Sequence, residues 1–460
     1  MIDMLYRNLP VFFQNLLCSL YGWKENRIRF NKLFEEQLLN LKKSEYWKRE
    51  EIKRYKENMM VASLKNAFSS VPYYKNVFKG IGLNVSEHVG FSDIYKLPIL
   101  TKEDIRHSNK ALLSTGVNIK ELVEQHTSGT TGKALTLYKH PNAIAQQWAV
   151  WFRHRARFNC DFGNLHVNFT GKQVVPIGQK GPPYWRFNSA SNQYLINMQH
   201  VSDTKIHEIV GFLNTINPKF YSGYPSIMAE VARLALKHDL PLFSKNRPSH
   251  IFCGAENTLD YQKEAMEQWT GAKITDQYGL TEGNCNMSRC EYGYYHEDFE
   301  FCHIECVDPE LLDNGRKKGK LVGTSFSNPA MPLLRYNTGD IAIWAPDDFQ
   351  CPCGRQSTVI ESVEGRVDDA IKLIDGRRVM RFDYIFKGFD SIREAQVCQF
   401  KEGEVMIKIV VRDNFESVTE DDLKSAFSQW ICSETKVFVK RVESIEKTSS
   451  GKFRAVKSYL

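Results

Sequence analysis

The chain has 460 residues, enough for two or three domains that each bury a core. Apolar residues make up 42% and charged residues 25%, as in an ordinary globular protein. The net charge of +7 arises from 61 basic and 54 acidic residues spread along the chain; it favours anionic ligands slightly and does not indicate a nucleic-acid-binding protein. Eleven cysteines without a recognisable secretory signal favour a reducing compartment, so we expect a cytoplasmic protein whose cysteines are thiols or metal ligands.

The segment at residues 1–23 is apolar but interrupted. It reads MIDMLYRNLPVFFQNLLCSLYGW, and polar residues such as Arg7, Asn8 and Gln14 break the apolar run. The run is too short to span a bilayer and lacks the small-residue cleavage site of a signal peptide. Two interpretations remain open: a helix packed on its own domain, which we favour, and an amphipathic helix that touches a membrane surface.

The following part of the chain predicts a layered α/β domain. Residues 24–70 carry Lys, Glu and Leu at helical spacing and predict helices. From about residue 120, short apolar strands alternate with helices. Polar segments that contain Gly follow three predicted strands, within residues 219–238, 248–271 and 272–283. Such segments lie at the carboxyl ends of strands, where α/β folds place their ligands.

The C-terminal part predicts a different, smaller domain. Three strands and one helix within residues 392–445 indicate an α+β fold. The fold class is therefore α/β, with two domains. We expect a large layered domain over residues 1–366, in which residues 1–70 are helical, and a small α+β domain over residues 367–460.

One loop has the composition of a phosphate-binding loop. Residues 126–133 read HTSGTTGK. Gly129 and Gly132 leave backbone N–H groups open to an anion, because no side chain lies in the way. The loop is not that of the nucleoside triphosphatases, which has four residues between its Gly and its Gly-Lys rather than two. A polar turn between strands has the same composition, so both interpretations stay open. The side chains that would add donors or charge to a phosphate are Ser128, Thr130, Thr131 and Lys133.

A second polar segment, YGLTEG at residues 278–283, combines an aromatic ring, a hydroxyl and a carboxylate. Tyr278 is suited to stack on a base, and Thr281 to contact a phosphate. Glu282 is suited to hold Mg²⁺ beside a triphosphate. A surface turn is the alternative interpretation.

Three further segments add charged groups. RYNTGD at residues 335–340 is predicted to end a strand with the carboxylate of Asp340. EGRVDD follows and contains Arg366, so that an Asp and an Arg are available for two ribose hydroxyls. Near the end of the chain, Lys452 follows a Ser-Ser-Gly turn. Each segment by itself is also compatible with a surface turn.

Together, in this order, the segments resemble the adenylate-forming enzymes: acyl-CoA ligases, luciferases and the adenylation domains of peptide synthetases. The matching motifs are SGTTGK, GAE, YGLTEG, RYNTGD, GRVDD and the terminal SGK. Within that family the chain is most similar to the phenylacetate–CoA ligase-like group and its capsular-polysaccharide-biosynthesis branch. The segments that carry this finer resemblance are SVPYYKNVF, PPYWRFN, SGYPSIM and CPCGR.

The resemblance implies the reaction and its cofactors. Such enzymes join a carboxylate to the AMP part of ATP with Mg²⁺, release pyrophosphate, and pass the acyl group to a thiol or an amine. The loop at 128–133 would hold the β- and γ-phosphates of ATP, and Asp340 with Arg366 would bind the ribose. The residues that would lie along the adenine or stack on it are Gly254, Ala255, Glu256 and Tyr278.

The resemblance also assigns catalytic and hinge residues. Lys452 would reach the carboxylate and the α-phosphate during adenylation, with Thr281 and Glu282 as further catalytic residues. A lysine and Mg²⁺ directed at oxygens that gain charge stabilise the transition state electrostatically. By the same resemblance, the large domain over residues 1–366 would bind ATP and the acyl group, and the small domain over residues 367–460 would be a mobile lid. Asp368 would be the hinge about which this lid turns between the two half-reactions.

Four residues predict a zinc site. Three thiolates and one imidazole complete a tetrahedral structural site for Zn²⁺, and similar Cys and His positions occur in the phenylacetate–CoA ligase-like group. We expect one Zn²⁺ that pins a loop at residues 285–300 against a strand near residue 350. A competing set, Cys302, His303 and Cys306, is interpreted as strand residues. The predicted ligands are Cys290, His296, Cys351 and Cys353.

One segment departs from the family pattern and leaves the acceptor open. CoA ligases of this group carry a Gly-rich turn, a proline and a glutamate after the hinge, whereas this chain has DGRRVMRFDYIF. The leading interpretation is a carboxylate ligase that passes the acyl group to an amine, on a sugar or nucleotide-sugar, in the synthesis of a capsule or other surface polysaccharide. Lys172 and Arg186 would either meet an anionic substrate or lie solvated on the surface.

Two alternatives remain. One is an acyl-CoA ligase for an aryl acetate, which uses CoA as the acceptor. The other is a catalytically silent scaffold that binds a nucleotide. In both enzymatic interpretations the partners are a small-molecule carboxylate and an amine or thiol acceptor. We expect no nucleic-acid partner. The sequence names neither the acid nor the oligomeric state.

Overall fold

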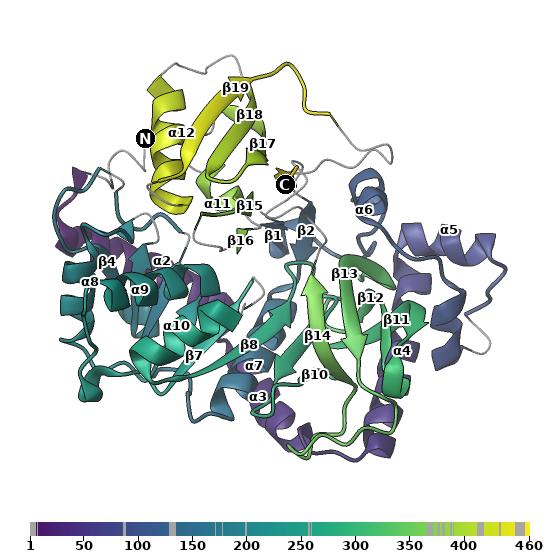
Figure 1. Cartoon of the computed structure of the whole chain (residues 1–460). Coiled ribbons are helices and arrows are strands. Elements are labelled where there is room, and N and C mark those ends of the chain that lie inside the picture. Colours follow the sequence, from purple (N-terminus) through teal and green to yellow (C-terminus); the bar gives the residue numbers. More distant parts are fainter. Residues whose placement is uncertain are drawn as a thin grey trace. The chain divides into compact units, whose positions relative to one another are not determined.

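A computed structural model of the chain describes residues 6, 8–85, 89–127, 135–170, 172–176, 178–197, 200–255, 258, 260–365, 371–374, 378–379, 382–386, 389, 391–411, 418–431, 434–446 and 456–460. The chain divides into two compact units (Figure 1). The large unit comprises Met1–Gln125 and Thr136–Gly365, and the small unit comprises His126–Leu135 and Arg366–Leu460.

A mixed sheet of twelve described strands forms the centre of the large unit, in the order β11-β12-β13-β14-β10-β9-β8-β7-β6-β3-β5-β4. Strands β8, β7, β6, β3 and β5 run parallel, the edge strand β4 is antiparallel to β5, and the remaining strands pair antiparallel. The strands are β3 (His166–Thr170), β4 (Trp185–Asn188), β5 (Gln193–Asn197), β6 (Phe220–Gly223), β7 (His250–Gly254), β8 (Lys273–Gly279), β9 (Asn286–Arg289), β10 (Tyr295–Glu297), β11 (Cys302–Leu311), β12 (Lys317–Ser325), β13 (Tyr336–Trp344) and β14 (Val359–Gly365).

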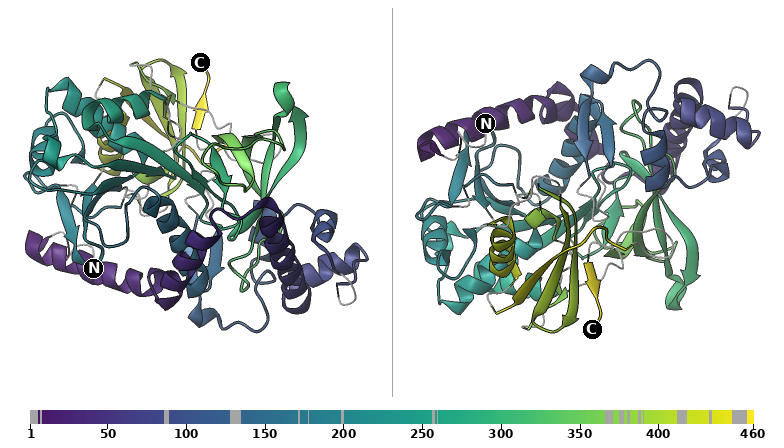
Figure 2. Two further views of the ribbon diagram at one scale, coloured as in Figure 1. Left: turned by 90° about the horizontal axis from the view of Figure 1, so that it is seen from below. Right: turned by 90° about the horizontal axis from the view of Figure 1, so that it is seen from above.

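Helices surround this sheet (Figures 1 and 2). The helices predicted within residues 24–70 are present, and the first of them begins earlier, at Val11. Local capping supports several: the Asn31 side chain accepts a hydrogen bond from the Phe34 N–H, and Thr101 forms a capping box with Asp104. The helices are α2 (Val11–Arg29), α3 (Lys32–Ser44), α4 (Arg49–Ser70), α5 (Pro72–Gly80), α6 (Lys102–Ser108), α7 (Pro141–Ala156), α8 (Ile206–Leu213), α9 (Pro225–Lys237) and α10 (Asp260–Thr270).

The main core of the antiparallel half lies between this half of the sheet and helices α3 and α7. Phe34 and Leu41 of α3 and Phe152 of α7 pack with apolar residues of strands β9 to β14. Burial of this apolar area stabilises the fold by roughly 25 cal/mol per Å². The layered α/β architecture predicted for this part of the chain is confirmed.

The three Gly-containing segments lie at one edge of the sheet. Strands β6, β7 and β8 are parallel neighbours, with Gly223 opposite Cys253 and Gly254 opposite Gln277. Their carboxyl ends therefore meet at the same edge, as the sequence predicted. One prediction is wrong: Asp340 does not end a strand but lies inside β13, because the strand begins at Tyr336 and continues through the motif.

A small two-stranded sheet, β1 (Val123–His126) and β2 (Thr136–Lys139), precedes α7.

The small unit has the predicted α+β composition. Its four described strands are ordered β19-β18-β17-β20, and a short pair, β15 and β16, is separate. Val397, Ile407 and Phe427 are among the residues of its own buried core. Its elements are β15 (Ile371–Lys372), β16 (Arg378–Val379), α11 (Asp383–Phe386), β17 (Ile392–Lys401), β18 (Glu404–Val411), α12 (Val418–Ile431), β19 (Lys436–Arg441) and β20 (Val456–Ser458).

Candidate active site

Part of the predicted site lies outside the described residues. The phosphate loop, one adenine residue, one ribose residue, the hinge and the catalytic lysine belong to this part. These residues are Ser128, Gly129, Thr130, Thr131, Gly132, Lys133, Glu256, Arg366, Asp368 and Lys452.

The two residues that flank the phosphate loop are held together. The backbone N–H of Thr127 donates to the carbonyl oxygen of Leu135 at 3.0 Å. The N–H of Leu135 in turn donates to Oγ1 of Thr127 at 2.9 Å. These two hydrogen bonds hold Thr127 and Leu135 next to each other.

The adenine segment follows β7. Gly254 is the last residue of this strand, and Ala255 follows it with φ = 67°. A positive φ in a residue with a Cβ is strained by about 1–3 kcal/mol, and such strain is frequent at binding sites. The chain turns sharply here, at the edge of the sheet that carries Tyr278 on the neighbouring strand.

Tyr278 and Asp340 are in direct contact. The Tyr278 hydroxyl donates to Oδ2 of Asp340 at 2.5 Å. Burial, and then the charge of Asp340, raise the pKa of Tyr278 well above its usual range, so the hydroxyl stays a donor. Asp340 is itself buried, with 7% of its surface exposed. The residues predicted for the adenine and the ribose thus lie side by side.

Glu282 is buried in the turn that follows β8. Its Oε1 accepts a hydrogen bond of 2.9 Å from the hydroxyl of Tyr336, a residue of β13. Thr281, the neighbouring residue, is exposed in the same turn. The turn therefore presents a hydroxyl to solvent and holds the carboxylate against the sheet.

A buried lysine that the sequence analysis missed lies near Glu282. Lys139, at the end of β2, donates to Oε1 of Gln147 at 3.2 Å. Its Nζ would be 2.9 Å from a Cβ built on Gly283, so only glycine fits there without displacing the lysine. Burial lowers the pKa of Lys139 to about 8, and the charge of Glu282 opposes this shift. A signal existed in the sequence: a lysine within the apolar strand segment LTLYKH.

The four predicted zinc ligands come together. The sulfur atoms of Cys290 and Cys351 are 3.7 Å apart, and Sγ of Cys353 lies 3.3 Å from Nε2 of His296. All four ligand atoms lie within 4.8 Å of one another. Around tetrahedral zinc with bonds of about 2.3 Å to sulfur, two sulfur atoms are about 3.8 Å apart. The donor set and its spacing fit Zn²⁺.

The ionisation of the cluster also fits a metal. Burial lowers the pKa of His296, which keeps the imidazole neutral, the form that binds zinc. The hydrogen bond from Cys290, followed by that from His296, lowers the pKa of Cys353 and favours its thiolate.

The elements that carry the cluster differ from the expected ones. Residues 285–300 are not a loop but contain the β9–β10 hairpin, with Cys290 at its turn and His296 on β10. The segment near residue 350 is not a strand but the connection between β13 and β14. His296 pairs with Val359 of β14, so the sheet register brings hairpin and connection together. The competing residues Cys302, His303 and Cys306 lie in strand β11, as interpreted.

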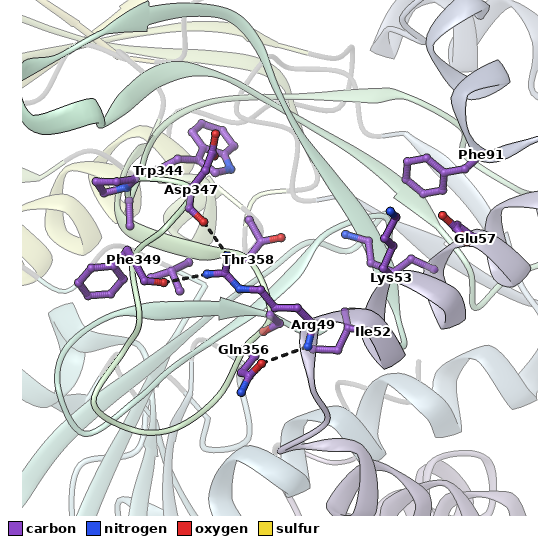
Figure 3. Close-up of a pocket in the computed structure, with 15 residues that line it drawn as sticks. Arg49, Ile52, Lys53, Glu57, Phe91, Trp344, Asp347, Phe349, Gln356 and Thr358 are labelled. Atoms are coloured by element: carbon purple, nitrogen blue, oxygen red, sulfur yellow. Dashed lines mark hydrogen bonds between the residues drawn. The ribbon is translucent and has the colours of Figure 1, made fainter.

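Helix α4 fastens the connection that carries Cys351 and Cys353 (Figure 3). The Arg49 guanidinium donates to the carbonyl oxygens of Asp347 and Phe349 at 2.8 and 2.9 Å, and the Arg49 N–H donates to Gln356 at 3.1 Å. These contacts hold the connection on both sides of the two cysteines. Arg49 and Phe349 also line a cavity of about 340 Å³, and its described lining residues include none of the predicted site residues.

Arg186 has a structural role. It is completely buried and donates to Gln14, Gln179 and the carbonyl oxygens of Pro183 and Trp185. Both predictions for Arg186 are therefore wrong: it neither contacts a substrate nor lies solvated on the surface, because it is buried and hydrogen-bonded within the protein. Lys172 is exposed and lies over the Tyr21 ring.

Comparison with known proteins finds relatives that are similar over most of the chain. A model of the CapK C-terminal domain matches residues 374–459. Protein CapK of Staphylococcus aureus is 24% identical over 81% of this chain and 79% of its own length. Phenylacetate-coenzyme A ligase of Pseudomonas putida is 27% identical over 75% of each chain. Over most of its length the chain is therefore similar to CapK and to the phenylacetate–CoA ligases. The resemblance read from the motifs is confirmed, and so is the prediction of an AMP-forming ligase.

Solved structures support the fold. A crystal structure of 2-hydroxyisobutyryl-CoA ligase in complex with R3-HIB-AMP matches with a TM-score of 0.56 at 18% identity, over 90% of each chain. Another, of the same enzyme with 2-HIB-AMP and CoA, matches with a TM-score of 0.58 at 17% identity, over 90% of this chain and 91% of the other. The predicted fold class is confirmed.

Proposed function

We propose that the chain activates a small-molecule carboxylate with ATP, releases pyrophosphate, and passes the acyl group to an amine. The amine belongs to a sugar or a nucleotide-sugar, and the product serves capsule or other surface-polysaccharide synthesis. The observation that carries the proposal is the contact of Tyr278 with Asp340 at the carboxyl edge of the parallel strands. Two motifs far apart in the chain meet there, as a bound nucleoside would require.

In the first step, a carboxylate oxygen of the substrate attacks the α-phosphorus of ATP. The bond from this phosphorus to the bridging oxygen breaks, and pyrophosphate leaves. Lys452 stabilises charge on the oxygens around the α-phosphorus, and Ser128 to Lys133 hold the departing phosphates. When bound, Mg²⁺ neutralises phosphate charge, and Glu282, positioned by Tyr336, is the residue to hold it.

In the second step, the acceptor nitrogen attacks the acyl carbon. AMP leaves, and the nitrogen loses a proton, which gives an amide. The amine acceptor is supported by the segment DGRRVMRFDYIF, which lacks the pattern expected of CoA ligases. The similarity to phenylacetate–CoA ligases favours the second candidate, in which the thiol of CoA is the acceptor and an aryl acetate the acid.

We also propose one structural Zn²⁺ on Cys290, His296, Cys351 and Cys353. Four protein ligands leave no position for water or substrate, so the ion ties the β9–β10 hairpin to the β13–β14 connection and takes no part in the reaction.

The test is pyrophosphate release from ATP with a panel of aryl acetates, amino acids, uronic acids and hydroxy acids, with and without CoA. Release with one acid is expected to fall about 10²–10³-fold in Lys452→Ala. A matched control is Lys424→Ala, on α12, which removes a partly exposed lysine paired with Asp421 and is expected to leave the rate unchanged. Turnover that requires CoA would replace the amine proposal by the thioester one. ATP binding without release, for every acid, would indicate the silent scaffold.

A further inference from the structure

Helix α2 has its polar side toward the protein and its apolar side toward solvent. Residues on the apolar side are between 40 and 73% exposed. A surface helix ordinarily packs the other way, with its apolar stripe on the core. The exposed residues are Phe12, Phe13, Leu16, Leu17, Leu20, Tyr21 and Trp23.

The inner side is polar because α2 covers an edge of the sheet rather than a face. Strand β4 is the last strand, so the backbone N–H groups along its outer side need acceptors. The side chain of Asn15 accepts from the N–H of Phe187 at 3.0 Å, and Ser19 accepts from the N–H of Ser189, just beyond the strand, at 3.0 Å.

Two further contacts complete this polar side. The buried Gln14 accepts from Arg186 at 2.7 Å, and Asn26 donates to the carbonyl oxygen of Ala190 at 2.8 Å. A Cβ on Gly22 would lie 2.3 Å from the Asn188 side chain, so the helix approaches the edge closely only with glycine there. These polar contacts fix which side of α2 faces outward.

The outer side forms a broad apolar surface. With 100° between successive residues, Phe12, Leu16, Leu20 and Trp23 form one stripe and Phe13 and Leu17 the next, an arc of about 140°. A seam between two helices is narrower and uses two positions in seven. The nineteen residues of α2 lie at the periphery of the large unit in both views of Figure 2. An exposed apolar patch of this kind marks an interaction surface.

The charge beside this surface is positive. Lys24 and Arg27 are exposed on the same side of the helix, and Arg27 lies over the Trp23 ring at 4.7 Å. The one carboxylate of α2, Glu25, points to another side, where it pairs with Arg29. Apolar residues, an aromatic ring and cations on one side complement acyl chains and anionic headgroups. No helix among the described residues is long and apolar enough to cross a membrane, so the contact would be with one surface.

We propose that the exposed side of α2 is a membrane-contact surface that binds bilayers containing anionic lipid. The helix lies in the interface, with Phe12, Leu16 and Leu20 among the acyl chains and Lys24 and Arg27 at the headgroups. A second copy of the chain is a poorer occupant, because a symmetric pairing would place the cations of each helix on the apolar residues or cations of the other. This proposal is independent of the acceptor and of the acid.

The test is sedimentation of the full-length protein with vesicles of phosphatidylcholine and phosphatidylglycerol in equal parts, and with phosphatidylcholine alone. The wild type is expected to bind the anionic vesicles more tightly. The double variant Leu16→Glu/Leu20→Glu is expected to bind them at least about tenfold more weakly. The matched control Leu311→Glu changes a leucine of β11 that is 75% exposed and is expected to bind like the wild type. The double variant Lys24→Gln/Arg27→Gln is expected to bind the anionic vesicles more weakly than the wild type. Its binding should also depend less on the salt concentration.

Unchanged melting temperatures and pyrophosphate release would show that the variants are folded, since the changed side chains point to solvent. Absence of vesicle binding by the wild type, or equal binding by the double variant, would overturn the proposal. Equal binding of both vesicle types would overturn its anionic-lipid part. If the wild type does not bind vesicles but is a dimer in analytical ultracentrifugation, and the double variant is a monomer, a second copy covers the surface instead.

Discussion

The hydroxyl of Tyr278 lies 2.5 Å from Oδ2 of Asp340, although β8 and β13, the strands that carry them, are not neighbours in the sheet. Three strands, β9, β10 and β14, separate them. Glu282, just beyond β8, likewise reaches Tyr336 of β13. The antiparallel half of the sheet therefore curls until β13 faces the end of β8. This curl brings together the motifs proposed to hold adenine, ribose and Mg²⁺.

The first prediction concerns that contact. Tyr278→Phe keeps the ring proposed to stack on adenine and removes the hydroxyl that positions Asp340. A hydrogen bond to a charged group contributes about 1.5–3 kcal/mol to stability, so we expect the free energy of unfolding to fall by up to this amount. Because Asp340 loses the group that positions it, we also expect a several-fold higher KM for ATP. The control is Tyr292→Phe, at an exposed tyrosine. An unchanged KM for ATP in Tyr278→Phe would separate this contact from the nucleotide site.

The second prediction concerns zinc. We expect about one zinc per chain in protein purified without chelator, and little in Cys351→Ser, because three ligands hold the ion less tightly. The melting temperature should fall with the metal content, since the ion ties the hairpin to the β13–β14 connection. Cys306→Ser is the matched control, from the competing set on β11, and should keep its zinc. Metal analysis by mass spectrometry decides this, and a zinc-free wild type would remove the site.

The third prediction concerns pH. The pKa of Lys139 is about 8 in the folded protein and near 10.5 when unfolded, so between these values the unfolded chain binds more protons. Stability should therefore rise with pH across this window, by at most about 1.4 kcal/mol per pH unit from this group. In Lys139→Met this contribution should disappear. Urea unfolding from pH 7.5 to 10 measures it, as the difference between wild type and variant. A difference that does not grow with pH would contradict the lowered pKa of the buried Lys139.

The fourth prediction concerns the proposed hinge. Asp368→Pro restricts the backbone where the small domain would turn. We expect pyrophosphate release to persist and transfer of the acyl group to slow. Single-turnover measurements of the two half-reactions test this separately. Equal loss of both would count against a hinge at Asp368.

Much of the local structure could be predicted because its causes are local. The helices within residues 24–70 follow from the spacing of their apolar residues, and the strand–turn–helix segments after residue 219 follow from strand patterns that end in glycine. The zinc set, Cys290, His296, Cys351 and Cys353, was predictable from residue type, because few arrangements use three thiols and one imidazole. The residues that hold these ligands in place could not be predicted from the sequence. Arg49, for example, lies about 300 residues from the β13–β14 connection to which it is hydrogen-bonded.

The sequence by itself determined the resemblance to the adenylate-forming enzymes, the order of the motifs and the predicted zinc ligands, since each depends on which residues occur and in what order. The tertiary structure alone decided that Tyr278 meets Asp340, that Lys139 is buried near Glu282, and that α2 turns its apolar side outward. Each depends on a partner distant in the chain: a strand brought round by the curl of the sheet, or an edge strand with N–H groups to satisfy. The order of polar and apolar residues predicts a helix or a strand, whereas tertiary packing decides which surface each side of that element faces.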